Sequence, residues 1–206
     1  MAIRFPAPVL VALGLAVPAS GAPRTYVIDA AASSVQVHVG KSGVFSFAGH
    51  THEVTAGRFE GHVEADPEDL SRSAVTITFE ASGLKVSAAE EPAGDAPKVQ
   101  DAMTGPKVLD AARFPTISFR SRQVSGRRTG EGAYELQVAG ELSLHGVTRA
   151  VTVPVRVQVE GATLTATGRA VVAQRAFGIE PVSAGGGTVK VKNEVGVEFR
   201  IVARPR

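Results

Sequence analysis

The chain has 206 residues, of which 44% are hydrophobic and 20% are charged, a composition typical of one globular domain with a sizeable core rather than of extended disorder. The formal net charge is only +2. Proteins that bind nucleic acid through electrostatic attraction normally carry a stronger excess of basic residues. Cysteine is absent, which excludes disulfides, thiolate nucleophiles, iron–sulfur clusters, cysteine-type zinc sites and an N-terminal lipoprotein anchor.

Residues 1–22 predict an export signal. Arg4 supplies a short positive segment, residues 9–17 form an apolar core, and small residues precede an expected cleavage after Ala22. The apolar core has about half the length that spans a bilayer, which favours cleavage over a retained anchor. We therefore expect residues 23–206 to form a single exported domain with no membrane span after processing.

Most of the remaining chain alternates apolar and polar residues with period two, the pattern of strands with one buried face. The clearest runs are residues 35–39, 75–79, 136–144, 151–159, 164–172 and 189–201. In residues 151–159 every odd position is valine. Such alternation predicts antiparallel pairing, because parallel strands covered on both faces read as continuous apolar runs.

Turn residues separate these runs at residues 40–43, 66–69, 126–132, 146 and 160–161. One segment differs, because residues 95–112 carry apolar side chains at helical spacing. Thr104 followed by Pro106 resembles a second helix start. The segment predicts two short helical turns that cross one end or flank of the sheet.

About eight or nine strands favour a sheet that closes into a barrel, since closure removes exposed edges, with a two-sheet sandwich as the alternative. Small residues share the inward side with aromatic ones, among them Gly61, Gly140, Ala166 and Gly168. They leave room for a ligand cavity, or they fit the taper of a small barrel. An eight-stranded barrel is wide enough to hold one small ligand.

Motifs that carry catalysis are missing from the sequence. There is no nucleophile elbow, and the glycine run at residues 185–188 lacks the lysine of a phosphate loop and predicts a turn. The acidic residues within 66–69 and at 90–91 are expected in solvated turns. His145 lies where a hairpin turns, and we expect it to hydrogen-bond locally. These observations predict a binding protein without a cofactor rather than an enzyme.

The histidines at positions 50 and 52 are the one group of side chains whose spacing suits binding of a ligand. Being two residues apart, His50 and His52 would face the same side of a strand, within reach of one metal ion or one anionic head group. A third ligand from His38, Glu53 or His62 is not established by the sequence. The alternative is a polar rim whose histidines bond to backbone carbonyls.

Ordered motifs give the chain a resemblance to a known family. They are Tyr26-Val27-Ile28-Asp29, Ser33-Ser34-Val35, Gly57-Arg58-Phe59-Glu60-Gly61, residues 110–119, residues 140–148, and Arg175 with Phe177-Gly178. Together they resemble the YceI-like family from about Tyr26 to Ile201. The resemblance implies an all-β, lipocalin-like antiparallel barrel, export to the periplasm, and binding of a polyisoprenoid or similar amphipathic lipid in an apolar tunnel.

From strand parity and this resemblance we predict which residues contact the ligand. The predicted tail contacts are Val37, Phe59, Ile77, Phe79, Phe119, Leu142 and Phe199; the predicted head-group contacts are His50, His52 and Arg175. Phenylalanine in place of Gly140 or Gly168 is expected to block lipid uptake while leaving the barrel folded. Two other functions stay open: a partner-binding barrel in stress response or membrane redox, and a metal protein that uses His50 and His52. A homodimer is also left open.

Overall fold

The computed structural model describes residues 23–42, 52–91, 93–184 and 189–206. Its strands are β1 (Arg24–Ile28), β2 (Ser34–Ser42), β3 (His52–Ala56), β4 (Phe59–Ala65), β5 (Ala74–Glu80), β6 (Leu84–Val86), β7 (Thr116–Gly130), β8 (Ala133–Leu144), β9 (Val147–Glu160), β10 (Thr163–Ala173), β11 (Ser183–Ala184) and β12 (Val189–Pro205). The helical elements are η1 (Ala30–Ala32), η3 (Leu70–Arg72), η4 (Ala81–Gly83), α1 (Ala96–Thr104) and η5 (Gln174–Phe177). The predicted all-β class is confirmed.

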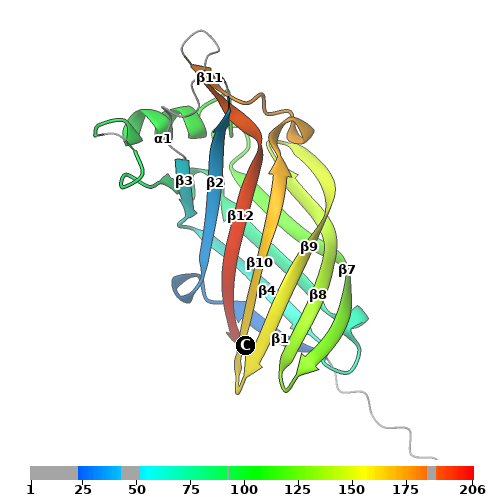
Figure 1. Cartoon of the computed structure of the whole chain (residues 1–206). Helices are drawn as coiled ribbons and strands as arrows, with labels where there is room; N and C mark the ends of the chain where they lie inside the picture. Colours follow the sequence, from blue (N-terminus) through cyan, green and yellow to red (C-terminus); the bar gives the residue numbers. More distant parts are fainter. Residues whose placement is uncertain (1–22, 43–51, 92, 185–188) are drawn as a thin grey trace, which may run out of the picture.

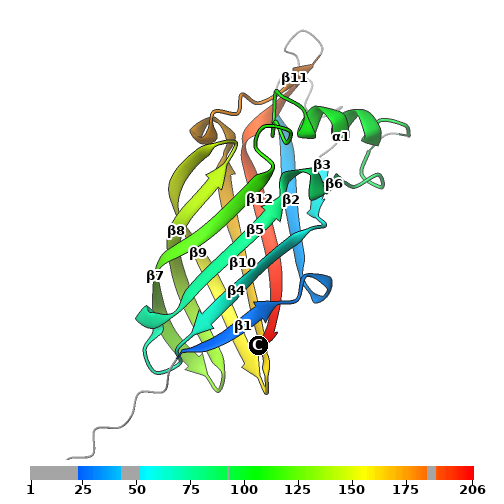
Figure 2. The ribbon, with the colours of Figure 1, turned by 180° about the vertical axis from the view of Figure 1, so that it is seen from behind.

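Eight of the strands close into an antiparallel barrel in the order β1-β4-β5-β7-β8-β9-β10-β12, and β12 pairs back to β1. The closing pairs include Tyr26 with Pro205 and Ile28 with Ala203. β2 continues the edge of β12 beyond β1 and carries β3 and β6 with it. Figures 1 and 2 show the long strands wrapping around the axis, with α1 and η5 at one end and the C-terminus at the other.

Three interruptions divide strands and help explain why the sheet has twelve strands rather than the expected eight or nine. β1 and β2 are separated by η1, where Asp29 caps the turn by accepting a hydrogen bond from the N–H of Ala32 at 3.1 Å. Gly57 separates β3 from β4, and η4 separates β5 from β6. A backbone hydrogen bond of 3.0 Å from Gly57 N–H to the carbonyl of Gly83 ties the last two breaks together.

The helical segment crosses the end of the barrel as predicted, but only its first half is a helix. α1 begins with a proline in its first turn, where no N–H is needed. After it, residues 105–113 form successive turns, with Leu109 N–H bonded to the carbonyl of Met103 and Asp110 N–H to that of Gly105. The predicted second helical turn is therefore wrong. Asp110 takes a positive φ of 44°, which does not continue a helix.

Two predicted turns are also shorter than expected. Residues 40–42 belong to β2, and β7 runs on to Gly130, so its hairpin turn is confined to Glu131 and Gly132. The rest of the first turn lies outside the described residues. In the part of the chain that the structure describes, no helix is long and apolar enough to cross a membrane.

Candidate functional site: an apolar cavity inside the barrel

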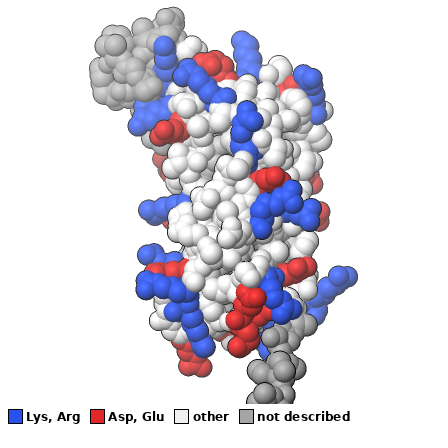
Figure 3. Space-filling model, turned by 90° about the vertical axis from the view of Figure 1, so that its right-hand side faces the viewer, with Lys and Arg blue, Asp and Glu red and all other residues white. Residues whose placement is uncertain are grey.

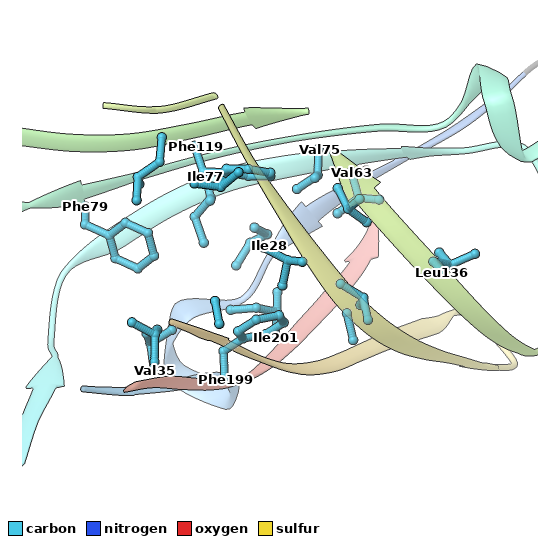
Figure 4. A pocket seen from close by; sticks show the side chains of 18 of the residues that line it. Ile28, Val35, Val63, Val75, Ile77, Phe79, Phe119, Leu136, Phe199 and Ile201 are labelled. Carbon is cyan, nitrogen blue, oxygen red and sulfur yellow. The ribbon is translucent and has the colours of Figure 1, made fainter. Parts of the chain in front are cut away.

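An apolar cavity of about 590 Å³ lies inside the barrel. All eight barrel strands contribute to its wall, which consists mainly of valine, leucine, isoleucine and phenylalanine side chains. Figure 4 shows such side chains, among them Ile28, Ile77 and Phe199, pointing from different strands toward a shared space. The alternation read from the sequence therefore directs one face of each strand into this cavity.

Six of the seven predicted tail contacts line the cavity. They are Val37, Ile77, Phe79, Phe119, Leu142 and Phe199. The seventh, Phe59, is not part of the lining and packs on Phe79, with 5.3 Å between the ring centroids. Their contact with a ligand remains a prediction.

Gly140 and Gly168 fit the second of the two alternatives for the inward glycines, because aromatic side chains fill the space beside them. A Cβ at Gly140 would lie 2.7 Å from Phe119 Cζ and 2.4 Å from the carbonyl oxygen of Arg120. A Cβ at Gly168 would lie 2.5 Å from Phe199 Cζ. Each glycine is covered by a phenylalanine ring of the neighbouring strand. Phenylalanine at either position would therefore displace backbone as well as side chains, which corrects the expectation of an intact barrel.

His52 is paired with the carboxylate of Glu91 at the end of the barrel that carries α1. It shares the inward face of β3 with Val54 and Ala56, and its Nδ1 hydrogen-bonds to Glu91 Oε1. The Glu91 side chain is only 2% exposed. Neither residue lines the cavity, although Val54 beside them does. The pair can fix the loop before α1 against β3.

Of the predicted His50–His52 pair, His50 lies outside the described residues. His38 pairs with Glu53 across β2 and β3 at 3.2 Å. Within the described ranges no three histidine, aspartate or glutamate side chains form a group able to hold a metal ion.

Arg175 lies in η5, at the same end of the barrel as α1 (Figure 1). Its guanidinium donates to the carboxylate of Glu180, with Nη2 and Oε1 2.6 Å apart. The hydrogen bonds from Arg175 hold the pKa of Glu180 below its ordinary value, and Glu180 raises the pKa of Arg175 in return. Neither residue lines the cavity, and both are exposed.

Asp66 lines the cavity near the opposite end, which corrects its expected place in a solvated turn. It is 1% exposed, and its Oδ1 accepts hydrogen bonds of 3.0 Å from the N–H groups of Glu68 and Asp69. Arg72 approaches its Oδ2 at 3.4 Å. An aspartate that bonds the backbone two residues ahead is a turn signature, and the Asp-Pro sequence could have indicated it.

His145 sits in the turn between β8 and β9, but its hydrogen bond is not local. Its Nδ1 lies 3.2 Å from the carbonyl oxygen of Phe177 in η5, and its ring packs edge-on against Phe114 at 4.9 Å. His145 therefore ties the hairpin to η5, an interaction that sequence neighbours could not reveal.

Comparison with known proteins places this geometry in a family context. The YceI-like domain matches the chain over residues 26–203. A UPF0312 protein of Vibrio cholerae is 26% identical over 150 residues, covering 70% of each chain, and a UPF0312 protein of Shewanella denitrificans is 27% identical over 154 residues, covering 74% of this chain and 72% of that one.

Two solved structures share the fold. BcnA of Burkholderia cenocepacia superposes with a TM-score of 0.65 at 24% identity, covering 85% of this chain and 98% of that one. A polyisoprenoid binding domain from Saccharophagus degradans, implicated in plant cell wall breakdown, superposes with a TM-score of 0.61 at 11% identity, covering 88% and 98%. The resemblance read from the sequence and the predicted barrel are thus confirmed.

Proposed function

Because the chain belongs to the YceI-like family, we propose that it is an exported binding protein that holds a polyisoprenoid or similar long amphipathic lipid inside its barrel. The observation that carries this proposal is the continuous apolar cavity of about 590 Å³, a size within the usual range for small-molecule sites. The name of the Saccharophagus relative points to the same ligand class.

The lining supports sequestration of hydrocarbon without specific polar contacts. Each CH₂ group buried away from water contributes about 0.8 kcal/mol, so a chain of many such groups gains affinity from the cavity wall alone. Ile77, Phe119 and Phe199 supply parts of this wall from three different strands. We assign them and the other predicted tail residues to the hydrocarbon chain.

The polar head group is assigned to the barrel end that carries α1 and η5. His52 and Arg175 are at this end, and each already has a carboxylate partner. An anionic head group would compete with Glu91 or Glu180 for these two side chains, whereas a neutral one would leave both pairs in place. His50 is retained as a further predicted contact outside the described residues.

Export to the periplasm agrees with the family and with the signal expected in residues 1–22, which lie outside the described residues. The proposed function requires no catalytic group and no cofactor. A homodimer is compatible with it but is not required for a ligand to be enclosed.

Mass spectrometry of an organic extract tests the proposal. The protein is purified from its native cell envelope and compared with a mock purification. We expect a long-chain lipid in stoichiometric amount, retained because the cavity shields it from water. An empty extract, combined with failure of the purified protein to bind added retinol, would contradict lipid binding and favour a scaffold that binds protein partners.

A further inference from the structure

The barrel wall is incomplete between β9 and β10. Their pairing begins at the hairpin, with Glu160 opposite Thr163, and ends at Val155 opposite Gly168. Beyond this point β9 continues to pair with β8 as far as Val147, and β10 continues to pair with β12 as far as Ala173. The two strands therefore diverge toward the end that carries η5, as Figure 1 shows.

Local chemistry accounts for the point of divergence. Pro154 is the first β9 residue beyond the last pair, and it has no N–H to donate to a neighbouring strand. Its carbonyl oxygen would lie 2.7 Å from a Cβ at position 168, so the close approach on the β10 side needs glycine. The sequence thus ends the ladder with a proline on one strand and a glycine on the other.

The gap does not run to an open end of the sheet, because η5 closes its far end through hydrogen bonds to β9 and β12. Arg149 Nε donates to the carbonyl of Ala176 at 3.0 Å, which links β9 to η5. Gln174 Nε2 donates to the carbonyl of Lys192 at 2.8 Å, and Asn193 Oδ1 accepts from the N–H of Arg175 at 2.9 Å, which link η5 to β12. The opening therefore has bonded edges on all sides.

The apolar cavity extends into this gap. Thr152 on β9 and Val171 on β10 belong to the outward set of their strands, yet both line the cavity. Val171 is also 66% exposed to solvent. Farther along the same strands, where the ladder is intact, the outward residues Arg156 and Thr167 do not line the cavity.

We propose that the gap between β9 and β10 is a lateral port through which the hydrocarbon chain of the bound lipid enters and leaves the cavity. This inference rests on the proposed function. The outward residues beside the gap, Ala150, Thr152, Pro154, Val171 and Ala173, carry no charge. Two arginines border the gap and both are bonded: Arg149 donates to the carbonyl of Ala176 at its far end, and Arg169 pairs with Glu198 at 3.0 Å. A hydrocarbon chain can therefore pass without desolvating a charged group.

The outer surface over β7 and β8 differs from the uncharged surface beside the port. Figure 3 shows lysine and arginine interspersed with aspartate and glutamate on the face that carries β7 and β8. Cross-strand pairs such as Arg122 with Glu141 at 2.7 Å and Arg127 with Glu135 at 2.8 Å cover paired strands there. A chain that crossed the wall at those places would have to separate ion pairs and ladder hydrogen bonds together.

Cross-linking tests the port directly, because the chain has no native cysteine to interfere. The double variant Thr152→Cys and Val171→Cys is joined across the gap by a bismaleimide with a cleavable internal disulfide, and retinol loading is followed by fluorescence. We expect loading and release at least tenfold slower than before cross-linking, with recovery after the linker is cleaved. The matched control joins Gln158→Cys to Thr165→Cys, which are register partners where the ladder is intact.

Retinol exchange at an unchanged rate in the cross-linked port variant would overturn the port. If the wild-type protein binds no retinol and its extract is empty, the proposed function fails instead. A single variant gives an independent check: Val171→Glu places a charge in the port and should slow loading severalfold, whereas Thr167→Glu, outward on the same strand below the port, should not. Equal rates for the two variants would also contradict the port.

Discussion

Two glycines inside the barrel, Gly140 and Gly168, are each covered by a phenylalanine ring of the neighbouring strand. The space beside these glycines is therefore filled and does not belong to the cavity. At Gly168 an added Cβ would meet both the Phe199 ring and the Pro154 carbonyl within 2.7 Å. Overpacking of this kind typically costs about 1–3 kcal/mol. We therefore predict that Gly168→Ala lowers the free energy of unfolding by that amount, as measured by urea denaturation.

Gly130→Ala is the matched control for this prediction. Its new Cβ would lie 3.6 Å from the Cβ of Ala133, an ordinary contact, so its stability should stay near that of the wild type. Equal stability of the two variants would show that the packing of the Phe199 ring does not require glycine at position 168.

The Arg175–Glu180 pair gives a pH prediction at the scale of single residues. Because the pKa of Glu180 is lowered in the folded protein, the pair's contribution is complete above the ordinary carboxyl pKa and is lost as the pH falls through the lowered value. Both side chains are exposed, so the effect on stability is small. In Arg175→Ala, carboxyl NMR should show the pKa of Glu180 rising toward its ordinary value.

Glu135 serves as the internal reference in the same spectrum. Its pKa is lowered by Arg127 rather than by Arg175, so it should not move in the variant. A Glu180 pKa that stays low without Arg175 would mean that another group holds it down.

At the scale of elements, α1 protects the edge of β6 through one side chain. Gln100 Oε1 accepts from the N–H of Val86 at 2.9 Å, and its Nε2 donates to the carbonyl of Leu84 at 3.0 Å, as a neighbouring strand would. Leucine at position 100 keeps the size but leaves both backbone groups unpaired, at a cost of about 1 kcal/mol.

Amide hydrogen exchange checks this role. In Gln100→Leu the amide of Val86 should exchange faster, while Lys98→Ala on the exposed side of the same helix should leave it unchanged. Unchanged exchange in Gln100→Leu would show that β6 does not need the helix for its protection.

Some of the secondary-structure elements can be predicted from the sequence alone, and others cannot. Period-two alternation identifies β9 and β12 because each has one face in the cavity and one in solvent. The break between β1 and β2 is not visible in that pattern, since it depends on η1 and on the hydrogen bond that the N–H of Ala32 donates to Asp29 Oδ1. The same limit applies to the second half of the helical segment, where local hydrogen bonds and the positive φ of Asp110 form turns instead of a helix.

For the whole molecule, the cavity is the feature on which the proposed function depends. Ala166 lines it from β10, whereas the adjacent Thr167 faces solvent. Ala166→Phe should fill part of the cavity and weaken retinol binding at least tenfold in a fluorescence titration. Thr167→Phe adds the same ring outside the barrel and should leave the affinity unchanged. Equal affinities would place the bound retinol elsewhere on the protein.

Strand parity predicts the cavity wall well but its openings poorly. Ile77 and Leu142 line the cavity, as alternation predicts, because it fixes the side of the strand on which a residue lies. The port between β9 and β10 depends on where two ladders end, which no single strand encodes. Glu91, the carboxylate partner of His52, likewise comes from a distant segment that only the fold brings next to β3.

The proposed function places a lipid chain in the interior of this barrel, and methyl NMR tests this placement most directly. With isoleucine, leucine and valine methyls labelled and geranylgeraniol added, we predict intermolecular NOEs to Val37, Ile77 and Leu142 in the cavity wall. The exposed Val27 and Val182 should show none. Bound lipid with NOEs only to the exposed methyls, and none to the cavity wall, would contradict an interior site.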